Sequence, residues 1–530
     1  MTMKQFITRL SVVALAIAAM VACGDKKGVD YTNIIPEHPM VLVEVDGYKT
    51  LDEAGLIDLV APYREQAAAL LGSQAGELVK NIILDVNNTG LETEAPMFLF
   101  VTGEENVEEI KIVAVAKVGD KAKVDELVAF VEENVGEIRK KEKDGAVVIS
   151  IEDEEEFMLG YNDHALVFAA EPDGAINSSD IFALLDKTAT PRATELAPMV
   201  GNSRVVVDLA PIFALVDQNS LWDEMNIDAE TMAQVEAVRN AVITVDNIIT
   251  EGKIVHTWTV SGMDEKFFND AVEGMPRVSN AFAEYIPEQS WAVLNFAINS
   301  TVIDAIGKAF ESVGAAEGIG KAERELVMSF LSTLSGDVTL ALNGADFYYE
   351  TIDAQAIIGT TNSSIYSYAQ VGATMALGLA SDEHGLMMPV GNNIVRLGQE
   401  GENILWAGVN NILGTQSDSI KDAAWFETVE DKAAYAVVNI AEICDDPTIR
   451  GEMEEALYDE LDDETAVAMV MDMVDLVDYA VFYSDVDVDN CASTATFELV
   501  LKSDADNALK QVVDIVGDYV EELAPAMMGF

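Results

Sequence analysis

Four apolar runs of similar length recur along the chain, and each meets an acid or an amide that is followed by another apolar residue. The runs begin at Ile35 (IPEHPMVLVEVDG), Arg204 (RVVVDLAPIF), Ile286 (IPEQSWAVLNFAI) and Tyr435 (YAVVNIAEIC). The polar residues are Glu44, Asp208, Asn295 and Asn439. Run length, β-branched content and flanking turn residues predict a β-strand in each run, followed by a helix.

The elements that follow each run also repeat. Second strands are expected at 95–103, 241–249, 336–344 and 479–488, and third strands at 110–118, 253–262, 354–361 and 494–503. A second helix follows, as at 120–136, where Val124, Leu127, Val128 and Val131 form one apolar stripe. The weakest of these helices is expected at 362–375, because that segment is short and contains glycine.

The chain is therefore expected to be α+β, built from duplicated strand-helix-strand-strand-helix units with antiparallel sheets. The order of elements resembles a ferredoxin-like unit. Residues 35–280 form the first half, with units near 35–200 and 201–280, and residues 281–530 the second, with units near 281–430 and 431–530. The first unit of each half carries an extra group of short strands around a Leu-Gly pair, Leu159-Gly160 and Leu397-Gly398.

The first 22 residues have the pattern of a secretory signal peptide. Lys4 and Arg9 are their only charges, and the apolar run from Leu10 to Ala22 is too short to span a membrane. The next residue, Cys23, completes a sequence that resembles the bacterial lipoprotein processing box, so we expect lipidation there. The alternative is an ordinary cleaved signal with a free cysteine. Residues 23–34 would form the tether, and Gly24 in place of Asp favours the outer membrane over retention at the inner membrane.

The composition of the chain excludes some classes of function. Asp and Glu total 93 against 31 Lys and Arg, a net charge of −62. Such a surface repels the phosphates of nucleic acids and anionic headgroups, so the lipid anchor must hold the chain at the membrane. Half of the residues are hydrophobic, which excludes wholesale disorder. Cys444 and Cys491 either pair in an oxidising periplasm or are separate thiols, and the sequence leaves both options open.

The N-terminal part of the expected body carries a family resemblance. Tyr31-Thr32-Asn33, Ile35-Pro36 and the turn from Leu51 to Leu56, together with the signal and the duplicated layout, are similar to one family of Bacteroidota lipoproteins. That family is catalogued as domain of unknown function 4836. The resemblance covers nearly the whole chain from Tyr31, implies location and architecture, and carries no activity.

The search for chemistry finds no catalytic, cofactor-binding or metal-binding motif. The four histidines, His38, His164, His256 and His384, are scattered, and neither a zinc-binding His-Glu-x-x-His helix nor a serine elbow occurs. The acidic cluster 152–156 is best explained as a solvated turn, with a weak divalent-cation site as the minority interpretation. Asp418-Ser419-Ile420 resembles a short O-glycosylation sequon at Ser419. Glu44, Asp208, Asn295 and Asn439 are better explained by bonds to local backbone than by a repeated site.

These observations favour a non-enzymatic binding or scaffold protein of the cell envelope, because stacked repeats create a long surface. A protein or glycan is the expected partner, and no cofactor is expected. The alternative is a carboxylate-based hydrolase acting on envelope glycans, since such enzymes need only two acids at the right distance.

Overall fold

The chain folds into two units, which we describe separately in a computed structural model. The first runs to Met263 and includes Ala505–Gly517, and the second comprises Asp264–Asp504 and Asp518–Phe530. The sequence placed the division at residues 280 and 281 instead. The structure describes residues 30–59, 61, 77–92, 95–103, 110–135, 138–151, 156–171, 175–190, 196–197, 199–218, 222, 227, 229–272, 276–304, 307, 325 and 328–527.

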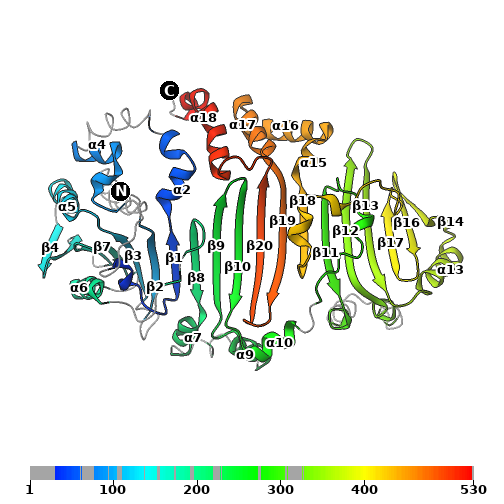
Figure 1. Ribbon diagram of the computed structural model, residues 1–530, viewed down its shortest axis with the longest axis horizontal. Coiled ribbons are helices and arrows are strands. Elements are labelled where there is room, and N and C mark those ends of the chain that lie inside the picture. The colour runs from blue at the N-terminus through cyan, green and yellow to red at the C-terminus, as the bar shows by residue number, and fades with distance from the viewer. Residues whose placement is uncertain are drawn as a thin grey trace. The chain divides into compact units, whose positions relative to one another are not determined.

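The described residues of the first unit contain ten strands, and every neighbouring pair is antiparallel (Figure 1). The pairing gives the order β10-β9-β8-β1-β2-β3-β7-β6-β5-β4. The strands are β1 (Val41–Val45), β2 (Met97–Thr102), β3 (Lys111–Lys117), β4 (Ile138–Lys143), β5 (Ala146–Ile151), β6 (Phe157–Tyr161), β7 (Ala165–Ala170), β8 (Ser203–Asp208), β9 (Val242–Thr250) and β10 (Lys253–Ser261).

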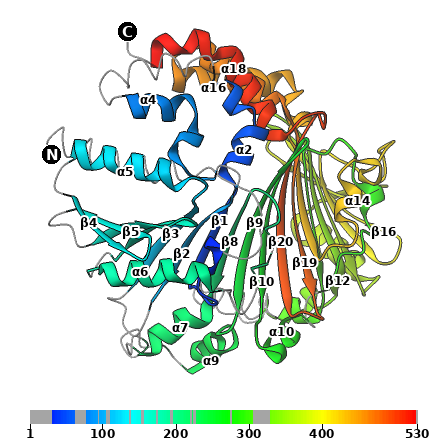
Figure 2. The same ribbon diagram turned by 60° about the vertical axis from the view of Figure 1, so that its left-hand side comes forward.

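Helices close both faces of the β3–β7 part of this sheet. Figure 2 shows α5 and α6 on opposite sides of these strands. Val124 and Val128 of α5 pack on one face, and Ile181 and Leu185 of α6 pack on the other. Asp120 accepts a hydrogen bond from the Ala122 amide at the start of α5, as expected of an N-cap. The helices of this unit are α2 (Gly47–Glu53), α4 (Glu77–Leu84), α5 (Lys121–Val135), α6 (Ser178–Asp186), α7 (Leu209–Gln218) and α9 (Ala229–Ala237).

The second unit also has ten strands in its described residues, again all antiparallel. Their order is β20-β19-β18-β11-β12-β13-β17-β16-β15-β14. The strands are β11 (Ala292–Ile298), β12 (Leu334–Asp346), β13 (Thr351–Thr360), β14 (Ala380–Asp382), β15 (Gly385–Val390), β16 (Asn393–Glu400), β17 (Ile404–Val409), β18 (Ala434–Asn439), β19 (Val477–Asp487) and β20 (Ala492–Leu501).

One face of the second sheet is a packed core. Ile357, Tyr435 and Val481 lie under Trp425 and Phe426 there. The helices that begin in this unit are α10 (Glu265–Val272), α13 (Ile365–Leu377), α14 (Phe426–Val429), α15 (Ile440–Cys444), α16 (Pro447–Leu461) and α17 (Glu464–Asp475), and α18 (Ala508–Met527) closes the described chain.

The strand order is identical in the two units, with each strand of the first matched by the strand ten places later in the second. The strand starting at Val41 and the one starting at Ala292 both occupy the centre, next to β8 and β18 respectively. The ferredoxin-like expectation is wrong. A split β-α-β unit places another strand between the two strands that the helix joins, whereas β1 and β2 are antiparallel neighbours.

Candidate functional site: an apolar cavity in the second unit

The second unit contains a cavity of about 320 Å³ between its sheet and α13. This volume falls at the lower end of the range for small-molecule sites. The sheet supplies the wall from β12, β13 and β15–β17, and α13 supplies Ile365 and Tyr366. Figure 1 shows α13 at the β14–β17 end of the sheet. The lining residues are Phe330, Val338, Ala356, Ile357, Ile358, Ile365, Tyr366, Leu386, Leu397, Gly398, Leu405, Trp406 and Ala407.

Tyr366 fixes the start of α13 against the sheet. Its hydroxyl donates to the Leu397 carbonyl at 3.1 Å and accepts from the Leu386 amide at 3.2 Å. Leu386 and Leu397 are partners on neighbouring strands, so one side chain satisfies a backbone group on each strand. Burial raises the pKa of Tyr366, which keeps the hydroxyl protonated and able to donate.

The first unit has a larger side chain at the equivalent position of its sheet. The register of β1–β2–β3–β7 leads from Glu44 to Val167, and the register of β11–β12–β13–β17 leads from Asn295 to Trp406. One residue further, Phe168 in the first unit corresponds to Ala407 in the second. A phenyl ring therefore occupies the place where the second unit has only a methyl group.

The covering helices differ in the same direction. In the first unit Val124 and Val128 of α5 are buried on this face, next to Ala116 and Leu166. Among the side chains of α13 that the structure describes, none is buried. In the described residues, the covering helix of the first unit therefore buries side chains on this face, whereas a cavity lies beneath α13 in the second unit.

The chemistry of the lining is uniform. Its thirteen residues include no charged side chain, and the polar atoms of Tyr366 are engaged with backbone. An apolar chamber of this kind stabilises a ligand by removing its hydrocarbon surface from water. Its described lining contains no carboxylate, histidine, cysteine or serine side chain.

Two of the recurrent polar residues lie mid-strand and contact other strands. Glu44 is buried opposite Arg204, which holds an ion pair of 2.7 Å with Asp246. Burial raises the pKa of Glu44 to about 7, Arg204 opposes this, and Asp246 and Asp46 add to it. The local-backbone interpretation is therefore wrong for Glu44.

Asn295 is the equivalent residue of the second unit. Its amide donates to Asn280 Oδ1 at 3.0 Å and to the Tyr435 hydroxyl at 3.3 Å, and its oxygen accepts from Thr339 Oγ1 at 3.1 Å. Tyr435 also donates to Asn280 at 2.8 Å. This network anchors the Asn280 loop to the sheet, so the local-backbone interpretation is wrong for Asn295 too.

The other two recurrent residues bond to backbone. For Asp208 this backbone is local, as expected, whereas Asn439 bonds to a carbonyl 149 residues away, so the local-backbone interpretation is wrong for Asn439. Asp208 accepts from the Ala210 amide at 3.0 Å, and it also contacts His38. Asn439 donates to the carbonyl of Ser290. The four positions therefore do not form one repeated site, because each has its own partners.

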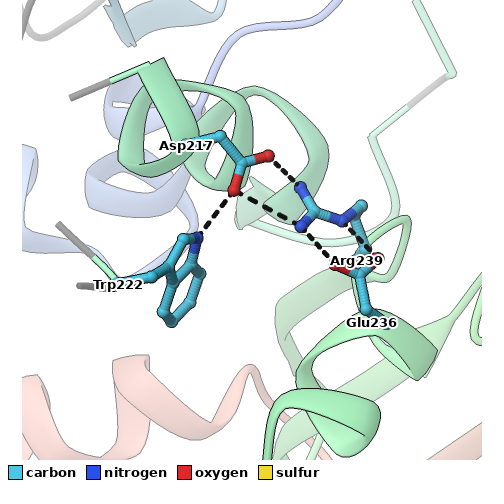
Figure 3. Close-up of polar contacts among 4 residues, drawn as sticks. All are labelled: Asp217, Trp222, Glu236 and Arg239. Carbon is cyan, nitrogen blue, oxygen red and sulfur yellow. Dashed lines mark hydrogen bonds and ion pairs between the residues drawn. The ribbon is translucent and has the colours of Figure 1, made fainter. Parts of the chain in front are cut away.

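A charged cluster of the first unit lies on α7, on α9 and just beyond them (Figure 3). Arg239 donates to Asp217 at 2.6 Å and to Glu236 at 2.6 Å, and the Trp222 indole donates to Asp217 at 2.7 Å. Arg239 holds the pKa values of both carboxyl groups below their usual range. Every member is satisfied by another, so the cluster ties the two helices together.

Comparison with known proteins assigns the family. A family model described as "Domain of unknown function (DUF4836)" matches residues 31–509. The chain belongs to the DUF4836 family. No curated protein matches the chain. A solved structure, crystal form I of TP0453, is similar at 9% identity over 73% of this chain and 94% of that chain, with a TM-score of 0.20. A TM-score this low carries no argument about fold or function.

Several predicted residues of this DUF4836 chain lie outside the described residues, namely Cys23, the signal at 1–22 and most of the acidic cluster 152–156. Ser419 is half-buried beside the fully buried Ile420 and directly precedes the short 3-10 helix Ile420–Asp422. In the described part of the chain, no group of three or more His, Cys, Asp or Glu residues is placed to hold a metal ion. Within the same residues, no helix is both long and apolar enough to cross a membrane.

The histidines and cysteines of the DUF4836 chain are dispersed. His38 precedes β1, His164 lies in the β6–β7 turn, His256 is on β10 beside Asn247, and His384 lies in the β14–β15 turn. Cys444, buried in α15, and Cys491, in the turn after β19, are both free thiols. Sequence reasoning missed the cavity. An alignment of the two halves on their Leu-Gly pairs would not have found it, because that alignment pairs Phe168 with Trp406, and only the strand register pairs Phe168 with Ala407.

Proposed function

We propose that the chain is a cell-envelope binding protein whose second unit takes an apolar ligand into the cavity beneath α13. The observation that carries this proposal is the contrast between the described residues of the two units: the same strand arrangement has buried Val124 and Val128 of α5 packed on this face in the first, and a cavity beneath α13 in the second. Packed interiors rarely keep voids of this size, because each one forfeits contacts and hydrophobic stabilisation. A retained cavity lined by apolar groups is therefore best explained by an occupant.

An internal duplication supports the proposal that the two units have different roles. We infer that the two halves arose from one ancestral unit, on the strength of their identical strand order and of the Leu-Gly pairs. Gly160 and Gly398 hold the same place opposite β7 and β17. At each, a Cβ would collide with a neighbour, Ile181 or Trp406. One copy could then keep a packed core while the other acquired a ligand.

The cavity proposal predicts that Ala407→Phe abolishes ligand binding, because it gives the second unit the ring that Phe168 supplies in the first. We expect the neutral fluorescent probe N-phenyl-1-naphthylamine to bind the natural chain and to lose at least about tenfold in affinity in the variant. The measurement is a fluorescence titration, with the melting temperature recorded to establish folding. Unchanged affinity in a folded Ala407→Phe variant would contradict the proposal.

A matched control is available in the first unit. Ala122 is an exposed alanine on α5, and Ala122→Phe adds the same ring to a solvent-facing position. We expect this variant to bind the probe as the natural chain does. Equal losses in both variants would show that the probe senses general surface hydrophobicity and not the cavity.

The location proposal rests on the N-terminal sequence. We propose that Cys23 is lipidated and holds the protein at the outer membrane. Cells labelled with radioactive palmitate are expected to transfer label to the natural protein and none to Cys23→Ala, which should leave the membrane fraction. Label that persists in the variant would exclude this anchor.

The hydrolase alternative has less support. Glycoside hydrolysis needs two carboxyl groups facing one another across the scissile bond, and the lining of the cavity has none. The buried carboxyl group of Glu44 has a raised pKa but is enclosed within a sheet.

A further inference from the structure

A row of apolar side chains crosses the second sheet from the cavity to the far strand. Directly paired residues of antiparallel strands share one face of a sheet, so successive partners trace the row. It consists of Leu386, Leu397, Ala407, Ala356, Leu340, Leu294, Ala436, Phe482 and Phe497. The first four of these residues also line the cavity.

The neighbouring row on the same face is equally apolar. It consists of Met388, Val395, Val409, Ala354, Leu342, Ala292, Val438, Ala480 and Leu499. We call these two rows the apolar band. At a strand spacing of about 4.8 Å, the band extends roughly 38 Å from β15 to β20.

The band is open to solvent over its middle. Leu340 and Leu294 are each 40% exposed, and Phe482 is 44% exposed. The opposite face of the same strands is the packed core beneath Trp425 and Phe426. Antiparallel sheets that pack on one face usually present polar residues on the other, so a continuous apolar second face indicates a binding surface.

Charge restricts what can occupy the band. The chain carries a net charge of −62, yet neither row contains a charged residue. α13 also lacks charge along its whole length, and its Tyr368, Val371 and Met375 are exposed. An anionic ligand would meet repulsion from the surrounding acids, which favours a neutral occupant.

We propose that the second unit binds a long-chain lipid with an uncharged headgroup, whose acyl chain ends in the cavity and lies along the apolar band. This inference rests on the proposed function, and it assigns the ligand class. The observation that supports the lipid proposal is that the cavity wall continues into the apolar band, because Leu397, Ala407 and Ala356 belong to both. A chain longer than the cavity gains by covering Leu340 and Leu294.

The test compares neutral monoacylglycerols of short and long acyl chains, about eight and about sixteen carbons, below their micellar concentrations. Each displaces N-phenyl-1-naphthylamine from the full-length protein. Full burial of a methylene is worth about fourfold in affinity, and half-burial on an open face about twofold. The long chain should therefore bind the natural protein at least about a hundredfold more tightly than the short chain.

The variants separate the band from the cavity. Leu340→Gln combined with Leu294→Gln should reduce affinity for the long chain about tenfold and leave the short chain unchanged. Leu99→Gln is the control, because Leu99 holds the same register position in the first unit and is 39% exposed. It should change neither affinity. Thermal melting of each variant establishes that it is folded.

Each other outcome is decisive. Equal affinity for the short and the long chain would be consistent with binding in the cavity, but it would contradict binding along the apolar band. Absence of binding by either lipid and by the probe would overturn the proposed function as well. If Leu99→Gln weakened long-chain binding as much as the double variant, the assignment to the second unit would fail. A dimer in sedimentation that the double variant dissociates would make a second copy the occupant and exclude the lipid.

Discussion

Glu44→Gln is expected to increase the free energy of unfolding by up to about 3 kcal/mol at pH 8 and to change it little at pH 4. Glu44 is only 8% exposed, and burial raises its pKa to about 7 in the folded chain. Its ordinary value is 4.5. A difference of this size corresponds to about 3 kcal/mol between the two protonation states.

The direction follows from the raised pKa. Below pH 4.5 the carboxyl group is protonated in both states, and its contribution to stability is fully present. Between 4.5 and about 7 the unfolded chain ionises first, so stability is lost as pH rises, and above 7 the loss is complete. Arg204 does not need the Glu44 charge, because its 2.7 Å partner is Asp246.

Urea unfolding of the natural chain and of Glu44→Gln at pH 4, 6 and 8 measures the difference. Glu383→Gln serves as the control, since that side chain is 87% exposed and should leave the pH profile unchanged. A natural chain and a Glu44→Gln variant with parallel profiles would show that Glu44 does not carry this dependence. The second unit already has the amide that the prediction favours, at Asn295.

Asn295→Leu is expected to destabilise the chain by about 2–4 kcal/mol. The substitution keeps a side chain of similar size, but it leaves the Thr339 hydroxyl without its acceptor and removes the donor to Asn280. Asn295 is 1% exposed, so water cannot replace these partners. A buried polar group left without a partner costs about 1–3 kcal/mol, and a connected network loses more than one bond.

Tyr435→Phe and the double variant complete a thermodynamic cycle for this network. Burial raises the pKa of Tyr435 to about 12, so the hydroxyl remains a neutral donor to Asn280. The double variant should cost less than the sum of the single variants, because the two residues share Asn280 as a partner. Strictly additive losses, or a loss below about 1 kcal/mol for Asn295→Leu, would show that the network contributes little.

The repeated strands were accessible from the sequence because their signals are local. Apolar runs of strand length, bounded by turn residues, placed the segments at Val41 and Ala292 and the inserts around Leu159 and Leu397. The neighbour of each strand was not accessible, because pairing joins residues far apart in the chain. The ferredoxin-like order failed for that reason, and β2 lies beside β1 instead.

The sequence predicted the helix that covers the site but not the cavity beneath it. The weakest of the expected helices, 362–375, which looked weak because it is short and contains glycine, proved to be α13, and its lack of charge suits it to cover an apolar cavity. The cavity wall itself differs from the first unit at Ala407, where the strand register of the first unit places Phe168. Such a difference has no signature in periodicity or composition, since both residues are apolar.

The strand order also has a consequence for how the chain reaches this structure. β4 to β7 and β14 to β17 each form from neighbouring hairpins, whereas the central contact of Val43 with Val205 must close most of the first unit into one loop. Closing long loops is slow relative to forming hairpins. The hairpin groups should therefore appear early in refolding and the central strands late, which leaves the middle of each sheet exposed longest to aggregation.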